Sequence, residues 1–172
     1  MELQSRDAPL PPFFAAVRRR HPDVDIVLLP PEQRAAEPAA EPGQREPATE
    51  RQLANAFDLA TGTATKVWAA AVGDGQVPDT RFAFGDDPAS VEARARLAGR
   101  IGDSPLESLA AALTRDGWEL AYRAGDVSQL VGRRATMHLS ATYAAESGSF
   151  VVTATSASLP VGADRARELA RR

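Results

Sequence analysis

The chain has 172 residues, no cysteine and a formal net charge of −3 at pH 7. This length accommodates one domain with appendages, and the lack of cysteine excludes a disulfide framework, thiolate metal ligands and a thiol nucleophile. Acidic and basic residues are interleaved, so no basic field is available for phosphate groups and we expect no nucleic-acid partner.

The first 48 residues are expected to lie outside the main domain. Within residues 1–30, a short helix is predicted between Leu10 and His21, followed by an apolar strand at Val24–Leu29. Residues 31–48 are rich in Pro, Glu and Ala and have no large apolar residue, which is typical of a linker. The N-terminus lacks the basic and apolar regions of a signal peptide, and no apolar run approaches the ~18 residues of a membrane span. We therefore expect a cytoplasmic protein without a membrane segment.

The main domain begins with a long amphipathic helix. Apolar side chains recur at spacings of three and four across residues 49–72, which predicts one buried helical stripe, and Gly73 ends this pattern. Trp68 lies on the stripe, and Trp118 lies on the apolar side of a later segment. Both are expected to be core residues rather than ligand platforms, because each falls on the apolar side of its own element.

Two extended segments follow the helix. A short strand is predicted at Arg81–Gly85. The next segment, 90–98, fits a helix as well as a strand, because Asp87-Pro88 resembles a helix start. Its apolar and polar residues alternate strictly, which favours a strand with Arg94 and Arg96 on the polar side.

A helix and three alternating segments complete the pattern. Ser104-Pro105 followed by Glu107 predicts a helix over 105–116. Alternation with a period of two then predicts three half-buried antiparallel strands, which are Trp118–Ala124, Ala135–Tyr143 and Phe150–Ser158. The segment Gly125–Gly132 is predicted as a loop, and Gly162 begins a short final helix.

These elements predict an α+β fold at 49–172. An antiparallel sheet of about four strands is expected, covered on one face by the helices at 49–72 and 105–116. The order of a helix, three strands and a helix resembles that of bacterial secretion-chaperone and adaptor domains, which implies a protein-binding role. The use of 19 Arg against one Lys, together with 34 Ala, indicates a GC-rich bacterial genome.

The sequence offers few groups for catalysis. His21 and His138 are its two histidines, and it contains no nucleophile elbow, P-loop or dinucleotide-binding turn. Potential metal ligands do not cluster, and an apparent calcium loop that starts at Asp74 has Gly85 where a glutamate is required. We therefore expect neither a cofactor nor a metal, and we favour a role without catalysis.

The polar sides of the predicted strands form the candidate site. We expect one sheet face to meet a protein partner or a second copy of the chain through Arg94, Arg96, Arg123, Thr136, His138 and Thr142. This favours a non-enzymatic protein-interaction module of the adaptor or chaperone-like kind.

The alternative is a small-ligand-binding protein or an enzyme. Its pocket would lie between helix 49–72 and the sheet, with His138 or His21 as acid or base. The position of His138 distinguishes the two hypotheses. An exposed histidine on a flat sheet supports the interaction module, and a histidine in a concave pocket beside a carboxylate supports the alternative.

We predict that trypsin first cuts the chain within residues 31–48, after Arg34 or Arg45. A proline-rich segment without core residues is more open to a protease than a packed domain is. The earliest fragments of a brief digestion would be identified by mass spectrometry. First cleavage at other arginines, with 31–48 left intact, contradicts the linker assignment.

Overall fold

The computed structural model describes residues 46–171, and this part of the chain forms an α+β fold of three helices on one sheet. The helices are α2 (Glu50–Val72), α3 (Leu106–Arg115) and α4 (Ala163–Leu169). The strands are β1 (Asp79–Phe84), β2 (Ser90–Arg100), β3 (Glu119–Arg123), β4 (Val127–Arg134), β5 (Met137–Ala144), β6 (Ser149–Thr155) and β7 (Leu159–Pro160). The predicted segment 1–30 and most of the predicted linker 31–48 lie outside the described residues, so this division stays a prediction.

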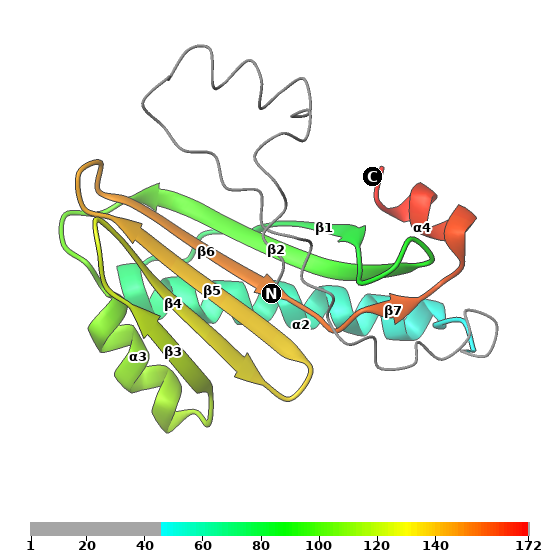
Figure 1. The fold of residues 1–172 in the computed structure, drawn as a ribbon, viewed down its shortest axis with the longest axis horizontal. Helices are drawn as coiled ribbons and strands as arrows, with labels where there is room; N and C mark the ends of the chain where they lie inside the picture. The colour runs from blue at the N-terminus through cyan, green and yellow to red at the C-terminus, as the bar shows by residue number, and fades with distance from the viewer. Residues whose placement is uncertain (1–45, 172) are drawn as a thin grey trace, which may run out of the picture. The chain divides into compact units, whose positions relative to one another are not determined.

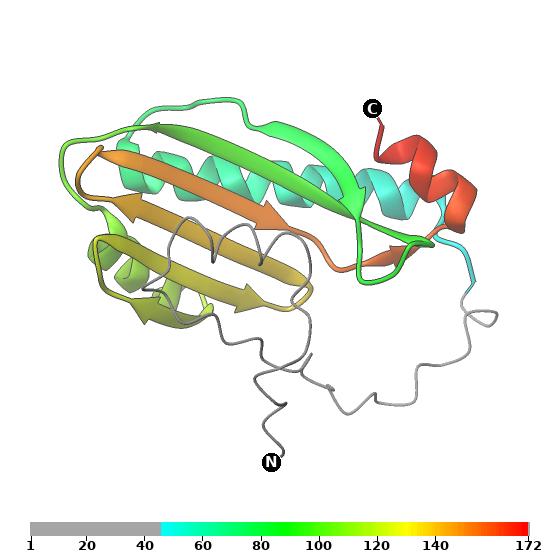
Figure 2. The ribbon, with the colours of Figure 1, turned by 45° about the horizontal axis from the view of Figure 1, so that its top comes forward.

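Every strand pair in the sheet is antiparallel. The order across the sheet is β1-β2-β6-β5-β4-β3, and the short β7 pairs with the beginning of β2. Figures 1 and 2 show the strands as one layer with α2 lying across its far side. The sheet is larger than the predicted sheet of about four strands, because β1, β4 and β7 also join it.

Local hydrogen bonds and one glycine define both ends of α2. Thr49 caps the N-terminus reciprocally with Gln52: the Gln52 backbone N–H donates to Thr49 Oγ1 (3.3 Å), and the Thr49 N–H donates to Gln52 Oε1 (2.7 Å). Gly73 ends the helix with a φ of 84°, a left-handed conformation that glycine adopts without a Cβ clash. The predicted helix 49–72 is therefore confirmed.

Two tryptophans organise the core between the helices and the sheet. The Trp68 ring stacks on Phe150 with 5.5 Å between ring centroids. A Cβ at Gly99 would lie 3.0 Å from the Trp68 ring, so glycine leaves the space that the indole needs. Trp118 lies close to Gly132 on β4 in a similar way. Both tryptophans are buried, which confirms their predicted place in the core.

The predicted loop at Gly125–Gly132 is wrong, because most of it belongs to strand β4. This strand pairs with β3 on one side and β5 on the other. Gly132 suggested a turn, but it lies inside the strand, where a Cβ would be 2.9 Å from Leu120 Cδ2 and 3.1 Å from the Trp118 ring. Close side-chain packing, rather than a turn, accounts for glycine at this position.

The predicted strand at 90–98 is confirmed as part of β2. Its buried apolar residues alternate with exposed Arg94 and Arg96. The other alternating segments form β3, β5 and β6, although β5 begins at Met137 and β6 ends at Thr155. Alternation therefore identified the faces of these strands correctly and their ends less accurately.

All three helices pack on the same face of the sheet. Helix α2 contacts β1, β2 and β6, and α3 contacts β3, β4 and β5. Helix α4 places Ala166 and Leu169 against Leu53 of α2 and Val91 of β2, on that same side. The opposite face, here called the open face, is covered by no helix of residues 46–171 (Figure 2).

We predict that Leu139→Ala lowers the free energy of unfolding by about 2 to 5 kcal/mol, because it leaves a cavity in a packed core. Leu139 is 1% exposed and lies on the helix side of β5. The matched control is Thr142→Ala on the open face of the same strand, which should cost less than about 1 kcal/mol. Denaturant unfolding of both variants measures the difference. Equal losses contradict the assigned faces, since a one-residue slip exchanges them.

Candidate functional site

Five of the six predicted site residues lie on the open face. They are Arg94 and Arg96 on β2 and His138 and Thr142 on β5, which alternate with buried side chains of their strands, and Arg123 on β3, which pairs with Gln129 of β4 on the same face. The register arranges them in rows. One row contains Arg94, Thr155 and His138, and another contains Thr142, Gln129 and Arg123.

Thr136 is the exception, and its predicted place on the open face is wrong. It lies in the turn between β4 and β5, next to Ala135, whose φ is 50°. Because β5 begins only at Met137, the alternation before that residue does not describe a strand. Thr136 instead lines a groove on the helix side of the sheet.

Three more arginines, which sequence reasoning missed, lie on the open face. Arg81 on β1 pairs across the strands with Arg94, and Arg133 on β4 pairs with His138. Arg100, at the end of β2, has the same parity as Arg94. Parity was the available signal. However, Arg133 lies between the predicted loop Gly125–Gly132 and the predicted strand Ala135–Tyr143, and Arg100 lies beyond the predicted end of the strand at 90–98.

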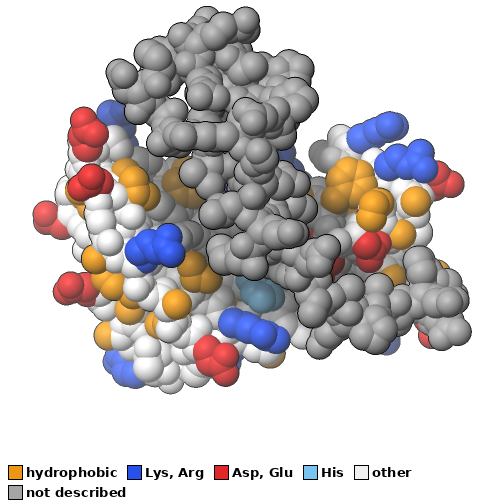
Figure 3. Space-filling model, in the orientation of Figure 1, with side chains coloured by type: hydrophobic (Ala, Val, Ile, Leu, Met, Phe, Trp, Pro, Cys, Tyr) orange, Lys and Arg blue, Asp and Glu red, His pale blue; other side chains and the backbone are white. Residues whose placement is uncertain are grey.

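The open face is positively charged, although the whole chain has a net charge of −3. It carries six arginines, which are Arg81, Arg94, Arg96, Arg100, Arg123 and Arg133, and three acidic residues, which are Asp79, Glu92 and Glu119. Arg94 pairs with Glu92, and the other five arginines have no ion pair or side-chain hydrogen bond among the described residues. Figure 3 views this side and shows basic side chains singly, among neutral, hydrophobic and acidic ones. These guanidinium groups are therefore available to carboxylates of another molecule.

His138 is exposed on this face near the beginning of β5, between Thr155 and Arg133 of the neighbouring strands. No described carboxylate forms a hydrogen bond or ion pair with it, and it does not line the groove on the helix side that Thr136 lines. A general base needs a partner that orients it and a site that holds the substrate. The surroundings of His138 provide neither, and His21 lies outside the described residues.

A groove of about 440 Å³ lies between α2, α3 and the turn from β4 to β5. Its lining includes the apolar side chains of Val67, Leu113 and Trp118. Lys66 and Arg134 also line it, with one carboxylate, that of Asp116. The groove occupies the position of the pocket that the alternative hypothesis requires, but no histidine among the described residues lines it.

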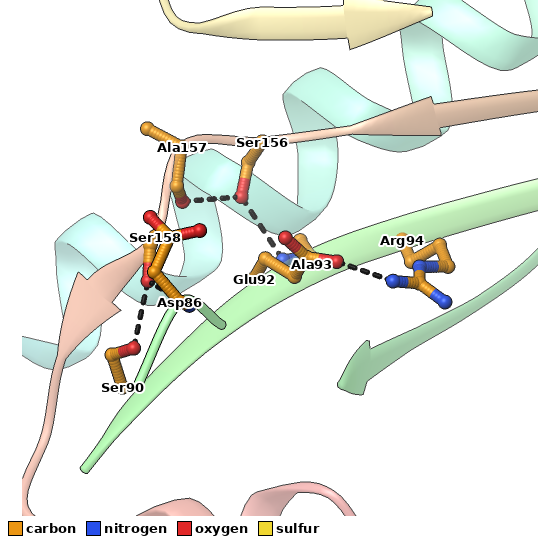
Figure 4. A network of polar contacts seen from close by, with 8 residues as sticks. All are labelled: Asp86, Ser90, Glu92, Ala93, Arg94, Ser156, Ala157 and Ser158. Carbon is orange, nitrogen blue, oxygen red and sulfur yellow. Dashed lines mark hydrogen bonds and ion pairs between the residues drawn. The ribbon is translucent and has the colours of Figure 1, made fainter. Parts of the chain in front are cut away.

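Three serines form a polar cluster where the chain returns along β2 (Figure 4). Strand β2 pairs with both β7 and β6. Two residues of β2 lie between these paired segments, whereas three residues, 156–158, lie between the paired parts of β6 and β7, so the chain forms a β-bulge there. Ser156 Oγ accepts a hydrogen bond from the Ala93 N–H (2.9 Å), and Ser158 Oγ donates to Ser90 Oγ (2.7 Å). These hydrogen bonds satisfy polar groups at the bulge, and no basic side chain of residues 46–171 forms a hydrogen bond with any of the three serines.

Metal clusters and spanning helices are absent from the described residues. No three acidic or histidine side chains gather there as a metal ion would require. None of the helices in residues 46–171 combines the length and the apolar character needed to cross a membrane. In comparisons with protein-family models, with curated proteins and with solved structures, nothing matched this chain.

Proposed function

We propose that the chain is a non-enzymatic protein-interaction module, of the adaptor or chaperone-like kind, whose open face binds an acidic surface of a partner protein. One observation carries this proposal. Five arginines of the open face have no ion pair among the described residues, although the whole chain has a negative net charge. A positive face of this kind is complementary to a surface rich in carboxylates, which would fix the orientation of the partner and speed its association.

The width of the open face favours a macromolecule over a small ligand. Arg96 on β2 and Arg123 on β3 are separated by β6, β5 and β4. Four spacings of ~4.8 Å place these strands about 19 Å apart. No single small carboxylate spans that distance, whereas a protein surface does.

The side chains between the arginines are short. Ser140, Thr153 and Ala121 share the central row of the face with Val131, which is 43% exposed. Short side chains on a regular strand let a flat partner approach, and the strands hold the arginine backbones in fixed positions. Each guanidinium can then form two parallel hydrogen bonds with one carboxylate. The exposed His138 fits the same surface as a polar contact.

The proposal is tested by a double charge reversal, Arg96→Glu with Arg100→Glu. Both residues are exposed and have no ion pair among the described residues, unlike Arg94, which pairs with Glu92. The partner would be recovered from the native host with the full chain as bait and titrated by calorimetry. We expect affinity to fall about 100-fold or more, because interface arginines at hot spots contribute about 2 kcal/mol each.

The matched control is Arg51→Glu with Arg115→Glu, which reverses two exposed arginines on the helices. It changes the net charge of the chain by the same amount, so a nonspecific charge effect would weaken binding equally. We expect the dissociation constant of this control to lie within about threefold of the wild-type value. The free energy of unfolding of both double variants should lie within about 1 kcal/mol of that of the wild type. Unchanged affinity of the open-face double, with an intact fold, excludes the open face as the binding surface.

A second candidate function is the binding of a small amphipathic anion in the groove between α2 and α3. Its volume of about 440 Å³ falls within the ~300 to 1,000 Å³ of typical ligand pockets. Lys66 and Arg134 line the groove without an ion pair among the described residues, so they are available to an anionic group.

We predict that Ala112→Trp weakens the binding of a fluorescent anilinonaphthalene sulfonate dye or of a fatty acid at least tenfold. Ala112 lines the groove, and an indole at this position would fill part of it. Ala111→Trp is the matched control, because Ala111 is the exposed neighbour on α3 and does not line the groove. Fluorescence titration measures both affinities. Equal binding by the two variants shows that the dye or fatty acid lies elsewhere.

A further inference from the structure

Strand β3 forms one edge of the sheet, and its outer side is open for pairing. The strand order ends at β3, which pairs with β4 alone among the described residues (Figure 1). Its sequence, Glu119–Arg123, contains no proline, glycine or lysine, residues that commonly prevent an edge strand from pairing. The outward N–H and C=O groups of such a strand can form a ladder with a second strand.

We propose that β3 pairs antiparallel with β3 of a second copy of the chain, centred on Ala121. In this register Glu119 lies opposite Arg123 of the second copy, and Leu120 lies opposite Tyr122. The two-fold symmetry repeats each contact, so the interface contains two oppositely charged pairs on the open face and two apolar pairs on the helix side. A self-complementary patch of this kind is what a two-fold dimer requires.

Three of the four side chains in these pairs are exposed. Glu119 and Arg123 are exposed and form no ion pair there. Tyr122 is 48% exposed although it lies on the helix side of the sheet, opposite the buried Leu130 of β4. Pairing would cover its ring with Leu120 of the second copy, which is partly buried and already packs against the core.

The register centred on Ala121 is the one that places opposite charges across from each other and keeps the open faces of both copies on the same side. A shift by one residue would place open-face residues opposite helix-side residues and turn the second sheet over. A shift by two residues would keep the faces but place Glu119 or Arg123 opposite Ala121, which loses both charge pairs. Pairing centred on Ala121 also uses all five residues of the strand.

The opposite edge of the sheet is less suited to the same contact. Strand β1 has six residues. Self-pairing over its full length would therefore place open-face residues of one copy opposite helix-side residues of the other. Pairing centred on Arg81 keeps the faces together but places two arginines opposite each other. Such like-charged cross-strand pairs are destabilising. Pairing centred on Phe82 also keeps the faces together, but it places Arg81 opposite Ala83 and contains no oppositely charged pair. The geometry therefore points to β3 as the dimer edge. In this dimer Arg123 pairs with Glu119 of the second copy, and the other four unpaired arginines of the open face remain available to a partner protein.

A charge-swap series tests the proposal with the full chain. Glu119→Arg and Arg123→Glu each replace two oppositely charged pairs by two like-charged pairs, and the double variant restores opposite charges in reversed order. Sedimentation equilibrium should show a wild-type dimer, a dimer dissociation constant raised about tenfold or more in each single variant, and recovery to within about threefold in the double variant. The control Glu146→Arg, in the turn between β5 and β6, should dimerise as the wild type does.

A crosslink provides a second measurement that does not depend on the charge variants folding well. The chain has no cysteine, so Ala121→Cys introduces a single thiol that would lie opposite its own copy. Opposite Cβ atoms in antiparallel strands are ~4.5 to 5.5 Å apart, close enough for a disulfide after a small adjustment. Mild oxidation should give a covalent dimer of this variant, whereas Ala98→Cys, exposed on the open face of β2, should stay monomeric on a denaturing gel.

Two results would overturn the inference. One is a wild-type chain that sediments as a monomer up to about 1 mM, a concentration at which even weak specific pairs associate, with no crosslink through Ala121→Cys. The other is a dimer whose dissociation constant is unchanged in both single charge variants, which would place the interface elsewhere. These outcomes are separable from the partner-binding test, because that test leaves Glu119 and Arg123 unaltered.

Discussion

The close approach of α2 to the sheet is the contact on which the rest of the fold depends. Small residues make it possible: Ala60 and Ala64 of α2 are fully buried, and so are the sheet residues Ala93, Ala95 and Ala154. Trp68 then fills the space beside Gly99 and stacks on Phe150. Its indole N–H donates to Asp74 Oδ1 at 2.8 Å, so the buried ring leaves no polar group unsatisfied.

Packing on one side explains why the two faces of the sheet differ so strongly. Every large buried side chain of the central strands, such as Leu97, Leu139 and Val152, points toward the helices. The alternate positions therefore contribute little to the core, and they can carry charge without the cost of burying it. The unpaired arginines of the open face are tolerated for this reason, and exposed charges of this kind contribute little to stability.

Much of this could be predicted from the sequence, because a half-buried strand imposes a period of two on its side chains. That period placed Arg94, Arg123 and His138 on one face correctly. It did not reveal β4, because Gly132 is required by the packing of Trp118 and Leu120, which come close to it only in the folded sheet. Nor could it reveal that the turn before Met137 removes Thr136 from the strand, since alternation continues through a tight turn without a change in composition.

The inclusion of β4 changes the edge of the sheet as well as its width. With β4 in place, β3 is not a neighbour of β5 but the outermost strand, and it is only five residues long. A two-fold pair of β3 strands closes on itself, whereas head-to-tail contacts would continue into filaments. Pairing through β3 would leave β1 at both outer edges of the joined sheet. Because β1 has six residues, pairing with itself over its full length would place open-face residues opposite helix-side residues, so this edge is less suited to extend the joined sheet.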